Sequence, residues 1–157
     1  FFSLDQQTKN LGSKLTNAVN EVLTSQQFVG GSFVATFEKQ FAQYLKTSHV
    51  VSLNSGTDAL WLAFKALNIK KDDIVLTTTF SFIASSSEIA RHEAHPVLID
   101  IDEQTLNISA DLMREWLEKN TIVKSGRAYH KETNFPVVGM VPVDMFGQCA
   151  DYKQLKE

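Results

Sequence analysis

Apolar side chains recur with helical spacing over the first 45 residues of the chain. Between about Gln7 and Leu23 they fall three or four positions apart, which predicts one amphipathic helix. A second apolar stripe runs from Phe33 to Leu45 and predicts another helix. Two glycines, Gly30 and Gly31, lie between the stripes and indicate a turn. We therefore expect residues 1–32 to form an N-terminal helical segment.

Beyond this point short apolar runs alternate with segments of helical character. The runs predict buried strands, at residues 49–53, 74–78, 96–101 and 137–143. The segments between them predict helices, at residues 57–67, 82–91 and 109–118, the last with Ser109 as its N-cap. Strict alternation favours parallel βαβ units, and continuously apolar strands are typical of a sheet covered on both faces. The predicted fold class is α/β, a three-layer α/β/α arrangement around a mostly parallel sheet.

Composition and charge argue against nucleic acid and membranes as binding partners. The net charge of the 157 residues is −3, so no strong positive field attracts nucleic acid or an anionic membrane. No apolar run reaches the length of a membrane span, and the first residues lack the pattern of a signal peptide. The single cysteine, Cys149, has no internal disulfide partner. We expect a cytoplasmic protein without nucleic-acid or membrane partners.

One polar stretch, residues 119–136, is long for a connection between a helix and a strand. It is either a surface excursion or a functional loop. We favour the surface excursion, because polar insertions at a surface have a small free-energy cost.

The turn at residues 54–58 joins a predicted strand to a predicted helix. In open α/β sheets ligands bind beyond the carboxyl ends of the strands, and a helix N-terminus there attracts anions. Gly56 lets the backbone approach a ligand closely, and Ser55 and Thr57 add hydroxyl donors. A phosphate fits this turn best. The alternative is that Ser55, Thr57 or Asp58 only caps the helix, and the turn alone leaves both interpretations open.

Other motifs limit the choice of ligand. The turn is neither G-x-G-x-x-G nor a P-loop, so a dinucleotide or nucleoside triphosphate is not favoured. At the carboxyl end of the next strand, Phe80 and Phe82 precede small residues. An aromatic ring there belongs to the core or stacks on a flat cofactor ring. His92 and His95 lack the zinc-protease spacing, and we predict no metal site.

Five segments together resemble the DegT/DnrJ/EryC1/StrS family of sugar aminotransferases, which have the fold type I architecture of pyridoxal-phosphate enzymes. They occur in the family's order and spacing and cover nearly the whole chain: FVGGSFVATFEKQFAQYL (28–45), NSGTDAL (54–60), TFSFIAS (79–85), PVLIDIDEQTLNI (96–108) and PVDMFGQCADY (142–152). The resemblance implies that residues 33–157 are the first part of the pyridoxal-phosphate-binding large domain.

The resemblance also implies roles for particular residues. Gly56, Thr57 and Asp58 correspond to the positions that bind the cofactor phosphate, largely through backbone N–H groups and the threonine hydroxyl. Phe82 corresponds to the aromatic ring that stacks on the pyridine, whereas Phe80 falls two residues early and is expected in the core. Residues Phe28–Gly31 correspond to a segment that helps to shape the sugar-nucleotide side of the site. Asp144, Gln148 and Asp151 fall in a segment near the mouth of the site, and no role is assigned to them.

The sequence also departs from the family pattern. Ser32 replaces a usual proline, and Ser125–Phe135 resembles an insertion. The family's Glu-Asp-x-x-Gln segment and its cofactor-bonding lysine have no counterpart in these 157 residues, so no catalytic residue is assigned. We expect this chain to be the N-terminal part of a catalytic domain.

The resemblance implies amino transfer from an amino acid, usually glutamate, to a nucleotide-linked keto-sugar, within a homodimer. Two alternatives remain. One is a pyridoxal-phosphate sugar dehydratase with histidine in place of the lysine. The other is a non-enzymatic binding or regulatory protein of the same fold.

Overall fold

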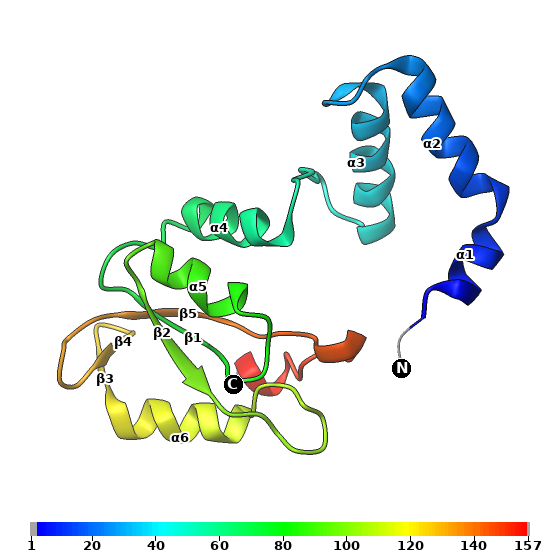
Figure 1. Cartoon of the computed structure of the whole chain (residues 1–157). Helices are drawn as coiled ribbons and strands as arrows, with labels where there is room; N and C mark the ends of the chain where they lie inside the picture. Colours follow the sequence, from blue (N-terminus) through cyan, green and yellow to red (C-terminus); the bar gives the residue numbers. More distant parts are fainter. Residues whose placement is uncertain (1–2, 157) are drawn as a thin grey trace. The chain divides into compact units, whose positions relative to one another are not determined.

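The computed structural model describes residues 3–156 and divides the chain into two compact units. One unit ends at Ser52 and the other begins at Leu53 (Figure 1). The predicted boundary between a helical segment and a larger domain at residues 32 and 33 stays a prediction.

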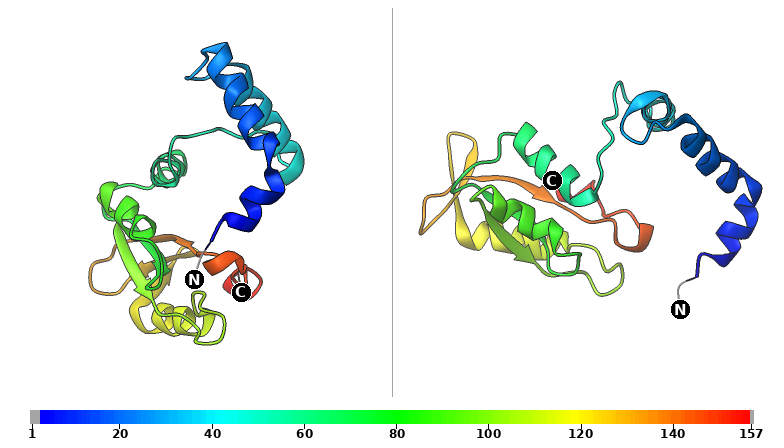
Figure 2. Two further views of the ribbon diagram at one scale, coloured as in Figure 1. Left: turned by 45° about the vertical axis from the view of Figure 1, so that its right-hand side comes forward. Right: turned by 45° about the horizontal axis from the view of Figure 1, so that its top comes forward.

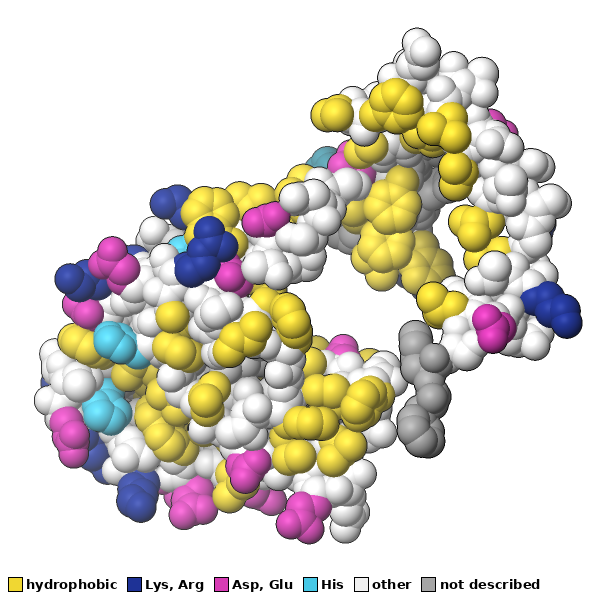
Figure 3. All heavy atoms as spheres, viewed as in Figure 1, with side chains coloured by type: hydrophobic (Ala, Val, Ile, Leu, Met, Phe, Trp, Pro, Cys, Tyr) yellow, Lys and Arg dark blue, Asp and Glu magenta, His cyan; other side chains and the backbone are white. Residues whose placement is uncertain are grey.

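The described part of the first unit, residues 3–52, contains three helices: α1 (Asp5–Leu11), α2 (Ser13–Ser25) and α3 (Gly31–Leu45). The prediction of one continuous helix from Gln7 to Leu23 is wrong, because Gly12 takes φ 49° and ψ −132° and breaks the chain into α1 and α2. Helix α3 confirms the second predicted helix. Hydrophobic side chains gather over it (Figure 3), and Phe41 stacks on Phe37 at 5.3 Å between ring centroids.

The prediction of a strand at residues 49–53 is wrong. Among the described residues, no strand pairs with this segment, and its Ser52 N–H donates to Glu38 Oε1 at 2.8 Å instead. An apolar, β-branched run forms a strand only where a neighbouring strand satisfies its backbone groups.

The second unit contains a three-stranded parallel sheet with the order β2-β1-β5. Its strands are β1 (Ile74–Thr78), β2 (His95–Ile99) and β5 (Val137–Val141). The central strand β1 is buried along its whole length, as its continuous apolar run predicts. Thr77, a polar residue in this strand, donates from Oγ1 to the Val141 carbonyl of β5 at 2.9 Å. The predicted parallel sheet is confirmed.

Helices cover both faces of this sheet, as Figures 1 and 2 show. Helices α4 (Gly56–Ala66) and α5 (Ala84–Arg91) lie on one face, and α6 (Ala110–Asn120) lies on the other. Alternate residues of β1 pack against the helices on opposite faces of the sheet, because successive side chains of a strand point to opposite faces. Ile74 packs in the core cluster that contains α6 residues, and Val75 packs in the cluster that contains Phe64 and Ile89. The three-layer α/β/α arrangement is thus confirmed.

The polar stretch after α6 is not an irregular loop. It forms an antiparallel hairpin of β3 (Thr121–Lys124) and β4 (Arg127–His130), followed by a bridge between Tyr129 and Pro136. The chain then ends in two short 3₁₀ helices, η1 (Met145–Gly147) and η2 (Gln154–Lys156). In the part of the chain that the structure describes, no helix is long and apolar enough to cross a membrane.

Candidate cofactor site

Three segments meet at the carboxyl end of the parallel sheet and line one cavity. They are the first turn of α4, the loop after β1 and the loop after β5. The cavity has a volume of about 460 Å³, and its lining includes Gly56, Thr57, Ser81, Phe82, Asp144 and Phe146. This is the edge at which open α/β sheets bind ligands.

The first turn of α4 carries the groups that suit an anion. Ser55 is the N-cap, and its Oγ accepts the N–H of Asp58 at 3.1 Å. The N–H groups of Gly56 and Thr57 and the Thr57 hydroxyl have no hydrogen-bond partner among residues 3–156. Two open N–H donors at the positive end of a helix form a ready site for a phosphate.

Asp58 has a structural role in the same turn. Its N–H is used by Ser55 Oγ, and its Oδ2 accepts the Ser55 hydroxyl at 2.9 Å. It is not among the residues that line the cavity. Ser55 and Asp58 cap the helix, whereas Gly56 and Thr57 remain open at the cavity, and the binding of a phosphate by this turn stays a prediction. A contact of Asp58 with a cofactor stays a prediction.

Phe82 follows β1 and lines the cavity with its side chain 74% exposed. A large aromatic ring left exposed beside a cavity is available to stack on a flat ligand. Phe80, expected in the core, is instead 43% exposed and packs edge to face with Phe146, at 6.3 Å between ring centroids. The structure thus brings three of the four predicted cofactor residues together: Gly56, Thr57 and Phe82.

Asp144, expected near the mouth of the site without an assigned role, lines the cavity, and the residues that the sequence did not single out there include Ser81 and Phe146. Ser81 Oγ lies 2.7 Å from Ser85 Oγ and holds the start of α5. Asp144 and Phe146 come directly after β5. The sheet topology could have predicted their place at the site, because loops that follow neighbouring parallel strands lie at the same edge of the sheet.

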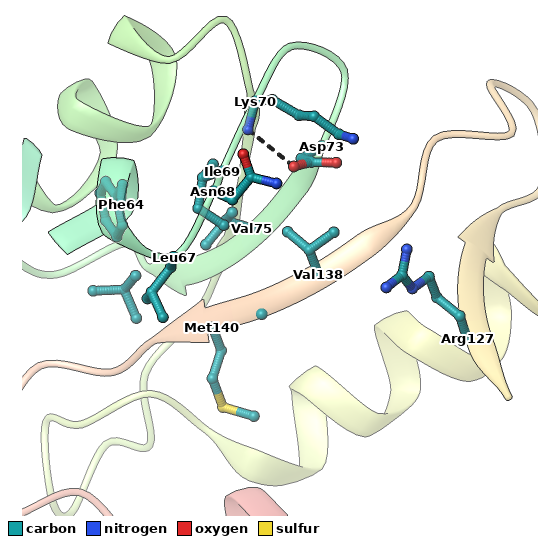
Figure 4. A pocket seen from close by; sticks show the side chains of 12 residues that line it. Phe64, Leu67, Asn68, Ile69, Lys70, Asp73, Val75, Arg127, Val138 and Met140 are labelled. Carbon is teal, nitrogen blue, oxygen red and sulfur yellow. Dashed lines mark hydrogen bonds between the residues drawn. The ribbon is translucent and has the colours of Figure 1, made fainter. Parts of the chain in front are cut away.

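A second cavity, of about 350 Å³, lies beside the outer edge of β5 (Figure 4). Its polar groups include Arg127 and Asp73, and Asp73 Oδ2 accepts the backbone N–H of Lys70 at 3.0 Å. None of the four predicted cofactor residues lines it. The group of open donors and the exposed ring at the first cavity make that cavity the better candidate site.

The lining of the first cavity fits a flat, phosphorylated cofactor. Open N–H groups and a hydroxyl lie at one side, and an exposed phenyl ring lies on the neighbouring loop. The same residues do not suit a metal ion, and no group of three or more His, Cys, Asp or Glu within residues 3–156 is placed to hold one.

Comparison with known proteins gives the family. The model of the DegT/DnrJ/EryC1/StrS aminotransferase family matches residues 9–157. The chain belongs to this family. Its parallel sheet, with helices on both faces, is that of the first part of the fold type I pyridoxal-phosphate aminotransferases.

Two relatives match almost the whole chain. A pleiotropic regulatory protein of Geobacillus stearothermophilus is 29% identical over 97% of this chain and 37% of its own length. A UDP-2-acetamido-2-deoxy-3-oxo-D-glucuronate aminotransferase of Pseudomonas aeruginosa is 28% identical over 97% of this chain and 38% of its own length. The chain therefore spans less than two fifths of the length of these relatives.

Solved structures agree with these matches. A DegT DnrJ EryC1 StrS aminotransferase from Brucella abortus superposes with a TM-score of 0.85 at 27% identity, over 99% of this chain and 39% of its own. NtdA from Bacillus subtilis, solved with bound cofactor PMP, superposes with a TM-score of 0.73 at 25% identity, over 92% of this chain and 29% of its own.

Proposed function

We propose that the protein carrying this chain is a pyridoxal-phosphate-dependent aminotransferase. Its substrates are an amino acid donor, usually glutamate in the family that the sequence resembles, and a nucleotide-linked keto-sugar. The product enters the synthesis of an amino-sugar for a surface polysaccharide or related glycan. The family and the sugar aminotransferases among its members support this assignment.

One observation carries the proposal. The open N–H groups of Gly56 and Thr57, the Thr57 hydroxyl and the exposed Phe82 ring all border the same cavity. These groups match the two ends of pyridoxal phosphate, an anionic phosphate and a flat pyridine ring. When bound, pyridoxal phosphate supplies an electron sink for amino transfer.

The residues of this chain would anchor and orient that cofactor. Gly56 and Thr57 would donate hydrogen bonds to the phosphate, aided by the positive end of the α4 dipole. Phe82 would fix the plane of the ring by stacking and would exclude water from that face. The chemistry itself needs a lysine outside these contacts, and no residue of this chain is assigned to it.

The test uses the full-length protein. Thr57→Val removes the hydroxyl donor but keeps the shape, and we expect pyridoxal phosphate to bind about tenfold more weakly, because a hydrogen bond to a charged group is lost. Thr79→Val is the matched control, since the Thr79 hydroxyl donates to Asp100 Oδ1 at 3.0 Å and Thr79 does not line the cavity. If both variants bind pyridoxal phosphate with equal affinity, the assignment of phosphate binding to this turn is wrong.

The two alternatives are separated by chemical trapping. Borohydride reduction of the full-length protein with pyridoxal phosphate, followed by intact mass and peptide mapping, reports whether a lysine bonds to the cofactor. One pyridoxyl group on a lysine supports the aminotransferase. Cofactor binding without this adduct favours the dehydratase or a non-enzymatic cofactor-binding protein, and no cofactor binding favours a regulatory protein, the word used for the Geobacillus relative.

We also propose that the full-length protein is a homodimer. The family resemblance implies a site shared between two subunits. Sedimentation velocity at several protein concentrations tests this, and a fully active monomer would contradict it.

A further inference from the structure

The loop that follows β5 forms the third wall of the candidate cofactor cavity, and its side chains Asp144 and Phe146 are not among the predicted cofactor contacts. We propose that Asp144 and Phe146 on this loop position the carbohydrate acceptor. Asp144 accepts a hydrogen bond from a sugar hydroxyl, and the Phe146 ring covers an apolar face of the sugar. This inference rests on the proposed function and extends it to the residues that determine substrate specificity.

The carboxylate of Asp144 is held by one of its two oxygens. Oδ1 accepts the N–H of Ala150 at 2.9 Å and the hydroxyl of Tyr152 at 3.1 Å. No donor reaches Oδ2 from any residue between 3 and 156. An ionised carboxylate accepts about four hydrogen bonds, so the orientation of Asp144 is fixed while half of its capacity stays open beside the cavity.

The charge of Asp144 decides which ligand group it suits. A carboxylate only accepts hydrogen bonds, and it repels the phosphate and the phenolate oxygen of pyridoxal phosphate. The hydroxyl groups of a sugar are donors and are present in several positions around the ring. Asp144 therefore suits the carbohydrate better than the anionic end of the cofactor.

The backbone places Phe146 in an unfavourable conformation. Its φ is 54° and its ψ 23°, in the left-handed region, which costs about 1–2 kcal/mol for a residue with a side chain. Burial does not offset this within the described chain, because the side chain is 83% exposed and contacts Phe80 only edge to face. Among residues 3–156, nine non-glycine residues have a positive φ, and Phe146 is the one of these nine that lines this cavity. Strain of this kind at a ligand site sets the direction of a side chain.

A buried asparagine holds the strained loop in place. Asn107 is 3% exposed, its Oδ1 accepts the N–H of Met145 at 3.0 Å, and its Nδ2 donates to the Gln148 carbonyl at 3.1 Å. The two bonds clamp the backbone on either side of Phe146. The left-handed turn is therefore built by the fold and presents the Phe146 ring at the cavity.

The lining of the cavity fits a sugar ring. Besides Phe82 and Phe146, it includes Leu60, Val143 and Met145, and its polar side chains are Thr57, Asp144 and the hydrogen-bonded pair Ser81 and Ser85. A hexose has hydroxyl groups on its rim and C–H groups on its faces. The combination of one oriented carboxylate and an aromatic face matches this pattern, as an aromatic ring packs on an apolar face while the carboxylate fixes the orientation.

The experiment uses the full-length protein loaded with pyridoxal phosphate. Isothermal titration calorimetry measures binding of UDP-N-acetylglucosamine, GDP-mannose and dTDP-glucose, and the best-bound probe is carried forward. We expect Asp144→Asn and Phe146→Leu each to weaken this binding about tenfold, with unchanged affinity for pyridoxal phosphate. Phe146→Tyr retains the aromatic face and is expected to restore sugar-nucleotide binding.

Asp102→Asn is the matched control for Asp144→Asn. Asp102 also accepts backbone hydrogen bonds with its Oδ1, from Gln104 and Thr105, and it does not line the candidate cofactor cavity. A urea unfolding midpoint for each variant shows whether the loop remains folded. In steady-state kinetics, Asp144→Asn and Phe146→Leu are expected to raise the KM for the sugar acceptor and to leave the KM for the amino acid donor unchanged.

The outcomes are distinct. If the wild-type protein binds pyridoxal phosphate but none of the three probes, the proposed sugar-nucleotide function fails. If the wild type binds a probe and both variants bind it equally well, the assignment of Asp144 and Phe146 is wrong. If the variants lose pyridoxal phosphate instead, the β5 loop contacts the cofactor and the inference is also overturned.

Discussion

Ser55 and Asp58 form a reciprocal pair at the start of α4. The Ser55 hydroxyl accepts the N–H of Asp58 at 3.1 Å and donates to Asp58 Oδ2 at 2.9 Å. The pair satisfies one donor of the first helical turn and fixes the turn geometry. Because Gly56 and Thr57 lie between the two residues, the cap also sets the direction of the N–H groups that remain open at the cavity.

The first prediction concerns this cap. Ser55→Ala is expected to lower the free energy of unfolding by about 1 kcal/mol, the usual effect of losing a serine N-cap. It is also expected to weaken pyridoxal-phosphate binding, because the turn that presents Gly56 and Thr57 loses its fixed geometry. Urea unfolding and a cofactor titration followed by absorbance measure the two effects on the full-length protein.

Ser109→Ala supplies a matched control for this cap. Ser109 caps α6 in the same way, with its Oγ accepting the Leu112 N–H at 3.3 Å. We expect a similar loss of stability and no change in cofactor affinity. Equal losses of cofactor affinity in both variants would show that the effect of Ser55 is general destabilisation.

The second prediction concerns the exposed ring of Phe82. Phe82→Ala is expected to weaken retention of pyridoxal phosphate by about tenfold, since aromatic pairs contribute about 0.5–1.5 kcal/mol beyond their buried area. Dialysis of the loaded full-length protein, followed by absorbance, measures the retention. Phe82→Tyr is expected to behave as the wild type, because the ring is kept.

Ile83→Ala is the control for the ring. Ile83 is the next residue, is 67% exposed and does not line the cavity. Retention is expected to be unchanged. If Phe82→Ala also leaves retention unchanged, a different ring stacks on the cofactor.

Several sequence-based predictions that depend on neighbouring residues were correct, and one that depends on residues distant in the sequence was wrong. Ser109 as an N-cap and the buried strand at residues 74–78 were predicted correctly, because capping and continuous apolar runs are local patterns. The strand at residues 49–53 was wrong because a strand depends on a partner elsewhere in the chain. The break at Gly12 was missed because the apolar stripe continues past it.

The candidate site shows the same difference between local and long-range interactions. Short motifs and the resemblance singled out Gly56, Thr57 and Phe82, and the structure places all three at one cavity, where cofactor binding stays a prediction. The strained conformation of Phe146 was not found from the sequence, because a positive φ is unusual for phenylalanine and depends on the clamp by Asn107, 39 positions earlier in the sequence. The two bonds to Asp144 Oδ1 likewise come from residues on the far side of η1.

The third prediction concerns alkaline pH. Burial, then the hydrogen bond to Asp144 and its negative charge, raise the pKa of Tyr152 above its ordinary value of 10.0. The unfolded chain then loses the phenol proton at lower pH than the folded chain. The contribution of Tyr152 to stability is therefore complete below pH 10 and is lost as the pH rises through the folded pKa.

Tyr152→Phe is expected to flatten the fall in stability above about pH 10, since the phenol no longer titrates. Urea unfolding of the full-length protein at several values between about pH 8 and 11 measures this. Tyr44→Phe, at an exposed position on α3, serves as the control. A curve for Tyr152→Phe that is parallel to the wild-type curve would contradict the assignment.

The last prediction concerns the packing that holds α5, and with it the Phe82 loop, on the sheet. Ile89 is completely buried and packs with Phe64 of α4 and Val75 of β1. Ile89→Ala is expected to lower the free energy of unfolding by about 2–5 kcal/mol and Ile89→Val by about 0.5–1.5 kcal/mol, because a cavity remains where methyl groups are removed. Ile83→Ala, the same change at an exposed position on the same side of the sheet, is expected to change it by less than about 0.5 kcal/mol. Urea unfolding of the three variants measures these values, and a loss at Ile83 as large as that at Ile89 would show that the loop before α5 is covered in the full-length protein.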